Sequence, residues 1–223
     1  HLKFYIENGG GYNDITPLRV TTSAGDVTFL ASADQLNGDI DADDTTITIA
    51  DSTGFPTAGK ILIDSEVISY TSITSNTLNG CTRGDSKIVV GVSTSTTAAT
   101  HSSGAAVTCF TIVVTDNSHG AEVNDFVTFS GAVALGGNID AEMLNQEYQI
   151  LNIEDANKYT ITAKSFSSNT ITDNNSTETS ATSSDSGNGG SSVVGAYQIN
   201  TGAYFVNPLV DWRASVWGTG VGG

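Results

Sequence analysis

The chain has 223 residues, of which 38% are hydrophobic, enough for one large β-domain or two small modules with a buried core. It carries 24 Asp and Glu against 8 Lys and Arg, a net charge of −16, which argues against a partner held through phosphate contacts. The two cysteines, Cys81 and Cys109, are too few for a disulfide scaffold and lack the spacing of a zinc site; one bridge stays open, although we expect free thiols.

Residues 1–33 are predicted to supply edge strands of a larger β-domain. His1–Ile6 alternates apolar and polar residues and ends at the turn signal Asn8–Gly11. Pro17 demotes the next extended run, Tyr12–Val20, to an edge strand or an extended crossing. Because the alternating run starts without Met or any leader, we expect a piece of a longer polypeptide.

Residues 34–108 are predicted to form an inserted β-module. Their short runs of branched and aromatic residues are typical of strands separated by turns. These runs are Thr46–Ile49, Lys60–Ile63, Glu66–Tyr70 and Asn76–Leu78. The Ser, Thr and Ala tract at Ser93–Ser103 then connects this module to the next one.

An acidic stretch precedes those strands and bears a partial likeness to a calcium loop. Asp39, Asp41 and Asp43 alternate, as oxygen ligands do in such a loop. The sixth position, however, is Asp44 where Gly is needed, and the twelfth is Ala50 where a bidentate Glu is needed. We therefore keep the three aspartates as weak calcium candidates, favour a solvated acidic turn, and predict no cofactor.

Residues 109–164 are predicted to form a second antiparallel β-module. Four strand-like runs lie between segments rich in Asn, Asp, Ser and Gly. The runs are Thr111–Thr115, Asp125–Phe129, Gln146–Ile153 and Lys158–Ile161. Asp155–Asn157 is short enough for a hairpin, and Ile139–Asn145 allows one or two helical turns. The fold class is therefore all-β, with tandem small antiparallel modules of sandwich or barrel type.

A sequence match suggests that the two modules are related to each other. Thr46–Ser52 is similar to Thr111–Asn117 at a spacing of 65, and a Gly-containing turn and a strand with Glu before Tyr follow each of them. The match is short, so coincidence remains an alternative.

The last part of the chain is predicted to be a loop followed by a return strand. Residues 165–192 are dominated by Ser, Thr, Asn, Asp and Gly, too few of them apolar to offset the entropy of ordering, which predicts a mobile loop or tip. Residues 193–223 return to a strand pattern and end in a segment rich in Trp and Gly.

Catalytic motifs are hard to find in this sequence. His101 lies in the Ser/Thr tract and His119 in a turn, and neither has the partners of a nucleophile and base pair in the sequence. No Gly-x-Ser-x-Gly elbow or phosphate-binding Gly loop is present. Arg83-Gly84-Asp85 spells an integrin-type tripeptide, but a turn at Gly84 beside a charge pair explains it better.

Several segments resemble parts of one family of virion proteins. His1–Gly10, leading into Tyr12–Pro17 with its Asp-Ile-Thr-Pro turn, resembles the blade-end pattern of tail nozzle or hub proteins, the tail tubular proteins of short-tailed bacteriophages. His119–Ala132 with Asn145–Ile150 is similar to the β-module that follows in those proteins.

Further segments extend the resemblance. Ala196–Gly202, followed by Trp212–Gly218, resembles the return of those proteins into the next propeller blade. A run in the first module also looks like a β-module common in virion proteins of marine phages. That run consists of Thr46–Asp51, Gly59–Glu66 and Asn79–Gly84. The resemblance implies β-modules inserted in a β-propeller, although the insertion at 34–108 departs from the nozzle pattern.

The resemblance implies a non-enzymatic structural protein of the phage tail. Its expected location is the virion, in a ring of copies around the DNA exit channel, with an adaptor protein and a fibre as further partners. The acidic charge suits a channel through which DNA passes without being bound. No apolar run reaches the roughly 18 residues of a membrane-spanning helix, so no membrane anchor is predicted.

Two other classes of function stay open. The first is an adhesin-like module that binds host-surface glycans by stacking sugars on exposed rings, for which Tyr204, Trp212 and Trp217 are the candidates. The same aromatic residues could instead pack in a core that is shared with neighbouring blades. The second is a glycan hydrolase, which needs two carboxylates across a cleft that sequence alone cannot place.

Overall fold

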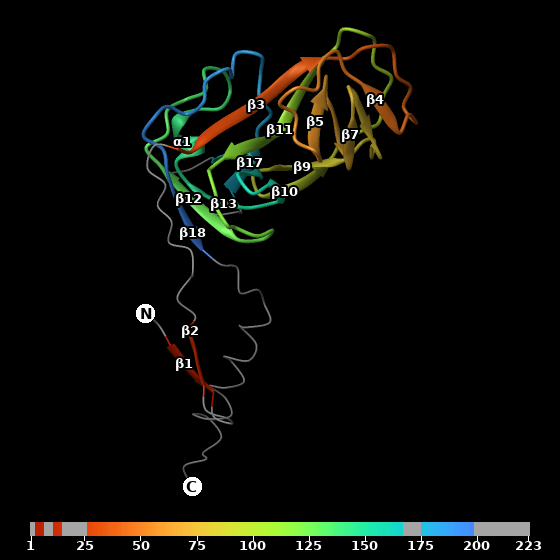
Figure 1. The fold of residues 1–223 in the computed structure, drawn as a ribbon. Coiled ribbons are helices and arrows are strands. Elements are labelled where there is room, and N and C mark those ends of the chain that lie inside the picture. The colour runs from red at the N-terminus through yellow and green to blue at the C-terminus, as the bar shows by residue number, and fades with distance from the viewer. Residues whose placement is uncertain (1–2, 7–10, 15–25, 167–174, 199–223) are drawn as a thin grey trace.

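The computed structural model describes residues 3–6, 11–14, 26–166 and 175–198, and this part of the chain is almost entirely β-structure (Figure 1). The only helix described, α1, is Ala141–Leu144. The strands are β1 (Lys3–Ile6), β2 (Gly11–Asp14), β3 (Thr28–Gln35), β4 (Thr46–Thr48), β5 (Gly59–Ile63), β6 (Glu66–Tyr70), β7 (Ser72–Thr74), β8 (Thr77–Asn79), β9 (Ser86–Val89), β10 (Val92–Ser95), β11 (Ala106–Thr115), β12 (Phe126–Ser130), β13 (Glu147–Gln149), β14 (Asn152–Asp155), β15 (Lys158–Thr162), β16 (Lys164–Phe166), β17 (Ser176–Glu178) and β18 (Val194–Gln198). All paired strands are antiparallel, which confirms the predicted all-β fold of small modules.

A long ribbon of β3 and β11 crosses the molecule and joins two hydrophobic cores (Figure 1). The register of this ribbon shifts between Thr108 and Ile112. Because successive side chains of a strand point to opposite faces, such a shift changes which positions face a core. Val107 and Cys109 accordingly lie in one core, whereas Ile112 and Val114 lie in the other.

Lobe 1, the part built on the first core, contains the β5–β6 hairpin and the three-stranded sheet β4-β8-β7. β5 also pairs with the first half of β11. Its buried apolar residues are Leu36, Ile40, Ile47, Ile49, Ile61, Ile63, Ile68, Tyr70, Leu78, Cys81, Val107 and Cys109. Branched side chains dominate this set, as expected for a core between pleated surfaces.

Lobe 2, the part built on the second core, contains the sheet β13-β12-β18, the β14–β15 hairpin and α1. β15 pairs with the second half of β11. The core is richer in aromatic rings than that of lobe 1, and Phe29 and Phe129 meet edge to face with ring centroids 4.9 Å apart. The predicted helical turns at Ile139–Asn145 are confirmed here, and so are three of the four predicted strands. The fourth run, Gln146–Ile153, is divided into β13 and β14, which belong to different sheets.

The pairing pattern of lobe 1 is repeated in lobe 2. The pairs β4:β8, β7:β8, β5:β6 and β5:β11 of lobe 1 correspond to β11:β15, β14:β15, β12:β13 and β12:β18 of lobe 2. All eight pairs are antiparallel and follow in the same chain order. The tandem relation suggested by the sequence is therefore matched by the topology.

An asparagine in one hairpin turn of each lobe accepts the same pair of backbone hydrogen bonds, an arrangement called here the asparagine bracket. The side-chain oxygen of Asn76 accepts from the N–H of Ser52 at 3.2 Å, and that of Asn157 accepts from the N–H of Ser118 at 2.9 Å. The backbone carbonyls of both asparagines also accept N–H groups, from Ile49 at 2.9 Å and from Asp116 at 2.8 Å. In each lobe the residue after this asparagine pairs with a threonine, Thr77 with Thr48 and Lys158 with Thr115. Thr48 and Thr115 are 67 positions apart, so the structural correspondence differs by two positions from the spacing of 65 in the sequence match.

The low-complexity region differs from the expectation of an unpacked loop. In its described part, Ser176, Ala181 and Asp185 are almost fully buried. The Asp185 carboxylate accepts the N–H groups of Gly137, Asn138, Ile139 and Thr182 at 2.8 to 3.0 Å, and the Thr182 hydroxyl at 3.1 Å. Polar bonds to a buried carboxylate thus order a segment that has little apolar surface.

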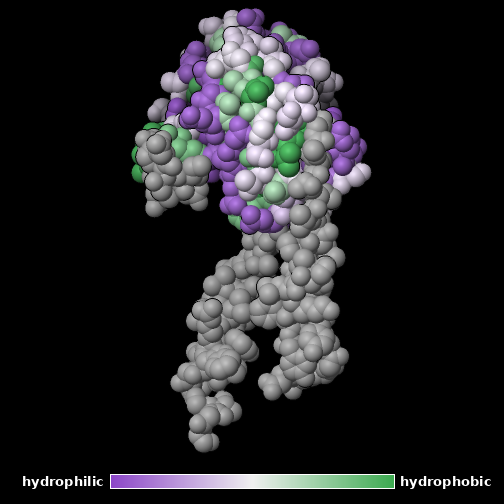
Figure 2. Space-filling view, turned by 90° about the vertical axis from the view of Figure 1, so that its left-hand side faces the viewer, coloured by the Kyte–Doolittle hydropathy of each residue, from purple (hydrophilic) through white to green (hydrophobic). Residues whose placement is uncertain are grey.

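The outer face of lobe 2 is a mixture of hydrophilic residues and small hydrophobic patches (Figure 2). Within the described ranges, no helix is long and apolar enough to cross a membrane.

Candidate functional site

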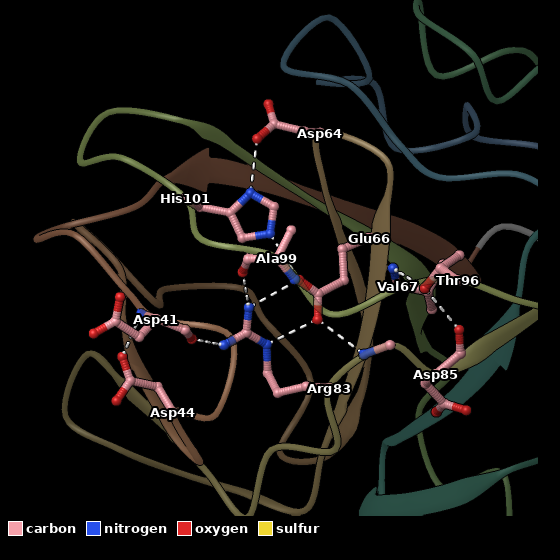
Figure 3. Close-up of polar contacts among 11 residues, drawn as sticks. Asp41, Asp44, Asp64, Glu66, Val67, Arg83, Asp85, Thr96, Ala99 and His101 are labelled. Carbon is pink, nitrogen blue, oxygen red and sulfur yellow. Dashed lines mark hydrogen bonds and ion pairs between the residues drawn. The ribbon is translucent and has the colours of Figure 1, made fainter.

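Lobe 1 contains a cluster of charged side chains, here called the ion cluster, formed by Asp64, Glu66, Arg83 and His101 (Figure 3). Glu66 opens β6, and Asp64 lies in the two-residue turn before it. Arg83 and His101 come from the segments that follow β8 and β10. The Glu66 side chain is 0% exposed, so a carboxylate has been placed inside a β-module, where it needs charged and hydrogen-bonding partners.

The Glu66 carboxylate is saturated with donors. Oε1 accepts Nε of Arg83 at 2.8 Å and the N–H of Gly84 at 2.9 Å. Oε2 accepts a terminal nitrogen of Arg83 at 2.8 Å, the N–H of Ala99 at 3.0 Å, and contacts Nε2 of His101 at 2.8 Å. A carboxylate has about four lone-pair sites, so five contacts leave it no capacity for another ligand.

The imidazole of His101 is held between two carboxylates. Its Nδ1 lies 2.7 Å from the Asp64 carboxylate and its Nε2 lies 2.8 Å from that of Glu66. An ionised carboxylate only accepts hydrogen bonds, so both ring nitrogens must carry a proton to bond both partners. This geometry therefore fits an imidazolium whose charge, with that of Arg83, balances Asp64 and Glu66.

Arg83 also ties two loops to the cluster. Its guanidinium donates to the carbonyl of Ala99 at 2.6 Å and to that of Asp41. The side chain is 6% exposed, so the Arg83-Gly84-Asp85 tripeptide does not present its arginine to a receptor. Gly84 adopts a positive φ of 63° in a turn, as the sequence predicted.

These contacts determine the protonation of Glu66. Burial opposes its ionisation, but the hydrogen bonds from Arg83, His101, Ala99 and Gly84 outweigh burial and lower the pKa to about 2. A base for catalysis needs a free lone pair near a substrate or nucleophile, and both nitrogens of His101 face carboxylates. The ion cluster is thus suited to fixing loops and not to proton transfer.

A shallow pocket of about 260 Å³ lies where lobe 1 meets lobe 2. Leu30 and Val113 come from the β3–β11 ribbon, and Phe55 and Thr57 come from a loop of lobe 1. On the other side, Glu154 of β14 accepts the Thr57 hydroxyl at 2.9 Å and the Thr57 N–H at 3.1 Å. Asp155 and Lys158 complete the lining.

The weak calcium candidates take part in loop hydrogen bonds. A carboxylate oxygen of Asp39 accepts the N–H of Ser103 at 2.8 Å, and a carboxylate oxygen of Asp44 accepts the N–H of Asp41 at 2.7 Å. No group of three or more His, Cys, Asp or Glu that could hold a metal occurs in the part of the chain that the structure describes. Asp43 has an exposed side chain in the same turn.

The other sequence candidates are placed as follows. Cys81 and Cys109 are free and buried, as expected. His119 is 3% exposed and packs on the ring of Tyr159, with centroids 5.0 Å apart, so it is part of the core of lobe 2. The three aromatic candidates for glycan binding lie outside the described residues; they are Tyr204, Trp212 and Trp217.

Sequence reasoning missed the ion cluster, because its hydrogen-bonded side chains are up to 37 positions apart in the chain. One signal was present. Glu66 begins the run Glu66–Tyr70, where four of five residues are buried and a charged residue needs a partner. No family model, no curated protein and no solved structure matches this chain.

Proposed function

We propose that the chain is a non-enzymatic structural component of a bacteriophage tail nozzle or hub, with the two lobes as a β-module inserted in a larger ring-forming protein. In this proposal the module supplies assembly contacts to an adaptor or fibre. The family resemblance suggests the setting, and the way in which the chain enters and leaves the two lobes carries the proposal.

Both connections to the rest of the chain lie at the same end of β11. Thr28, near the start of the two lobes, pairs with Thr115 at the end of that strand. Tyr197, near their end, donates its hydroxyl hydrogen bond to Asp116, the next residue. Incoming and outgoing segments that lie together are typical of a domain inserted in another one, because the host fold is then little disturbed.

The charge of the chain fits a position beside moving DNA. With a net charge of −16, the surface repels phosphates, so the duplex would slide past and would not stick. The ion cluster and the Asp185 contacts fix loops through hydrogen bonds, which suits a module that must keep its shape under load.

The proposal is tested by peptide mass spectrometry on purified particles of the phage that encodes this chain. We expect peptides from both lobes in the intact virion, in a fixed ratio to the portal protein, and ring-shaped assemblies in negative-stain images of the isolated protein. Absence of these peptides from virions that infect normally would overturn it.

A second function is favoured by the pocket between the lobes, namely binding of a host-surface glycan. The pocket offers the apolar Phe55 and Leu30 beside Glu154 and Lys158, a combination of apolar surface and hydrogen-bonding groups that sugars use. Saturable binding of host envelope polysaccharide that Phe55→Ala weakens would support it. Binding that is absent, or that the substitution leaves unchanged, would exclude this pocket as the site.

A further inference from the structure

The β9–β10 hairpin of lobe 1 has two backbone edges with different surroundings. Val89 and Val92 flank its two-residue turn and are paired. In a hairpin of this kind the flanking pair exchanges hydrogen bonds, so every second residue points its N–H and C=O toward the partner strand. The alternate residues, such as Ile88 on β9 and Ser93 on β10, point their N–H and C=O groups outward, away from the partner strand.

The outer edge of β9 is covered by β17 of lobe 2. Ile88 donates its N–H to the Glu178 carboxylate at 3.1 Å, and Val90 donates to the Thr177 hydroxyl at 3.0 Å. Gly91 donates to the carbonyl of Ser176 at 2.8 Å. This edge is therefore satisfied inside the molecule.

Among the described residues, none covers the outer edge of β10 in this way. Its register places the N–H and C=O groups of Ser93 and Ser95 on this side, and no described residue pairs with them. All four residues of β10 are exposed. Proteins protect an open edge by keeping the strand short or by using Lys, Pro, a bulge or an inward charge. β10 is short, with four residues, but its Val-Ser-Thr-Ser sequence has none of the other protections.

The turn of this hairpin is also unusual for an exposed segment. Val90 has a φ of 48°, a conformation that is strained for a β-branched residue, and its side chain is 50% exposed. Val92, two residues later, is 63% exposed. A turn that only had to reverse the chain would favour Asn-Gly at these positions, so the exposed valines call for a contact.

Charge favours a second copy of this chain as the contact partner. No Asp or Glu occurs between Asp85 and Asp116, and the hairpin carries only Lys87. Two copies of a chain with a net charge of −16 repel each other, and this repulsion is smallest where neither surface carries carboxylates. A second copy of the same hairpin meets this condition.

We propose that β10 pairs antiparallel with β10 of a second copy of this chain. The contact is isologous: the same open edge is used on both sides, and the two hairpins form one four-stranded sheet β9-β10-β10-β9 with the exposed valines at its ends. The inference comes from the geometry of the hairpin and does not need the phage assignment.

Ser93→Pro tests the pairing, because proline removes the outward N–H at this position and leaves the bonds between β10 and β9 in place. Sedimentation of the full chain over a range of concentrations should show dimers, or assemblies built from dimers. Ser93→Pro should raise the dissociation constant of this association at least about tenfold, so that species of half the mass persist to higher concentration. Ser93→Ala keeps the N–H and should associate as the unchanged chain does. A monomer at every concentration, or association equal in the two variants, would overturn the proposal.

Crosslinking gives a second test that does not depend on proline. Ser93→Cys should be joined to itself between two chains by a short bismaleimide, whereas Ser102→Cys, also exposed and in lobe 1, should not. The natural thiols should not interfere, because burial raises the pKa of Cys81 to about 11 and that of Cys109 still further. Equal crosslinking at the two positions would show random collision and count against the pairing.

Discussion

The two lobes share their strand pairing but stabilise it with different chemistry. In lobe 1 the turn of two residues between Ile63 and Glu66 joins β5 to β6, and Glu66 is buried under a loop that carries Ala99 and His101. In lobe 2 the corresponding pair is Thr128 with Glu147, and α1 lies in the connection. Glu147 is exposed, and its carboxylate accepts a hydrogen bond from the side-chain amide of Gln198 at 3.4 Å.

This difference shows that burial of the glutamate depends on the covering loop and not on the strand pairing. A Glu at the start of the strand is compatible with the fold in both lobes. It becomes an ionised core residue only where Arg83 and His101 close over it. Lobe 2 places its buried carboxylates elsewhere, among them Asp185 in the segment that follows β17.

Among the variants that test this comparison, Arg83→Met is expected to lower the free energy of unfolding the most. It leaves the Glu66 carboxylate buried without its guanidinium, and breaking such a pair costs about 3 to 5 kcal/mol of unfolding free energy. Urea denaturation of the full chain measures it. Glu147→Gln, at the matching position of lobe 2, is the control and should stay within about 0.5 kcal/mol. Similar losses for both would show that the lobes do not differ in this way.

Acid should destabilise the ion cluster at a defined pH. The pKa of Glu66 in the fold, about 2, is below its ordinary value of 4.5, so its contribution to stability is complete above pH 4.5 and is lost as the pH falls toward 2. The shift corresponds to a loss of about 3 kcal/mol. Thermal unfolding followed between pH 6 and pH 2 should show this decline, and Glu66→Gln should flatten it. An unchanged decline in Glu66→Gln would assign it to other carboxylates.

Asp185→Asn tests the anchor of lobe 2 and should cost about 2 kcal/mol, because an amide replaces one acceptor oxygen by a donor that faces buried N–H groups. Burial opposes the ionisation of Asp185, but the N–H groups of Ile139, Thr182, Asn138 and Gly137 lower its pKa, so the acid should bind them as an anion. Amide hydrogen exchange at Ile139 should speed up in the variant. An equal increase in lobe 1 would mean global unfolding and not loss of a local anchor.

The sequence predicted the parts of this fold that follow from local patterns. Alternating branched residues identified β11, β12 and β15, and Asp155–Asn157 identified a hairpin, because strand propensity and turn chemistry act over a few residues. The pairing of Thr28 with Thr115 could not be read in this way. It depends on a bulge that exchanges the two faces of β11 in the middle of the strand.

The candidate site was harder to predict, for a physical reason. His101 looked like part of a polar connecting tract, and its role appears only when the loop folds back onto Asp64 and Glu66. Composition also predicted that residues 165–192 lack packed structure, since it counts apolar surface and does not count hydrogen bonds to one buried carboxylate such as Asp185.

Changes in the asparagine bracket should cause the smallest loss of unfolding free energy, and they test the relation between the lobes most directly. Asn76→Ala and Asn157→Ala each remove the side-chain oxygen that accepts a backbone N–H at the hairpin turn, from Ser52 and Ser118 respectively. Each should cost about 1 kcal/mol in urea denaturation, with Asn76→Ala the larger because its amide also donates to the carbonyl of Ala50 at 2.9 Å. The sites lie in different lobes and share no partner, so the double variant should equal the sum within about 0.5 kcal/mol. A clear departure from additivity would show that the two turns act as one unit, and the picture of two separately anchored lobes would then fail.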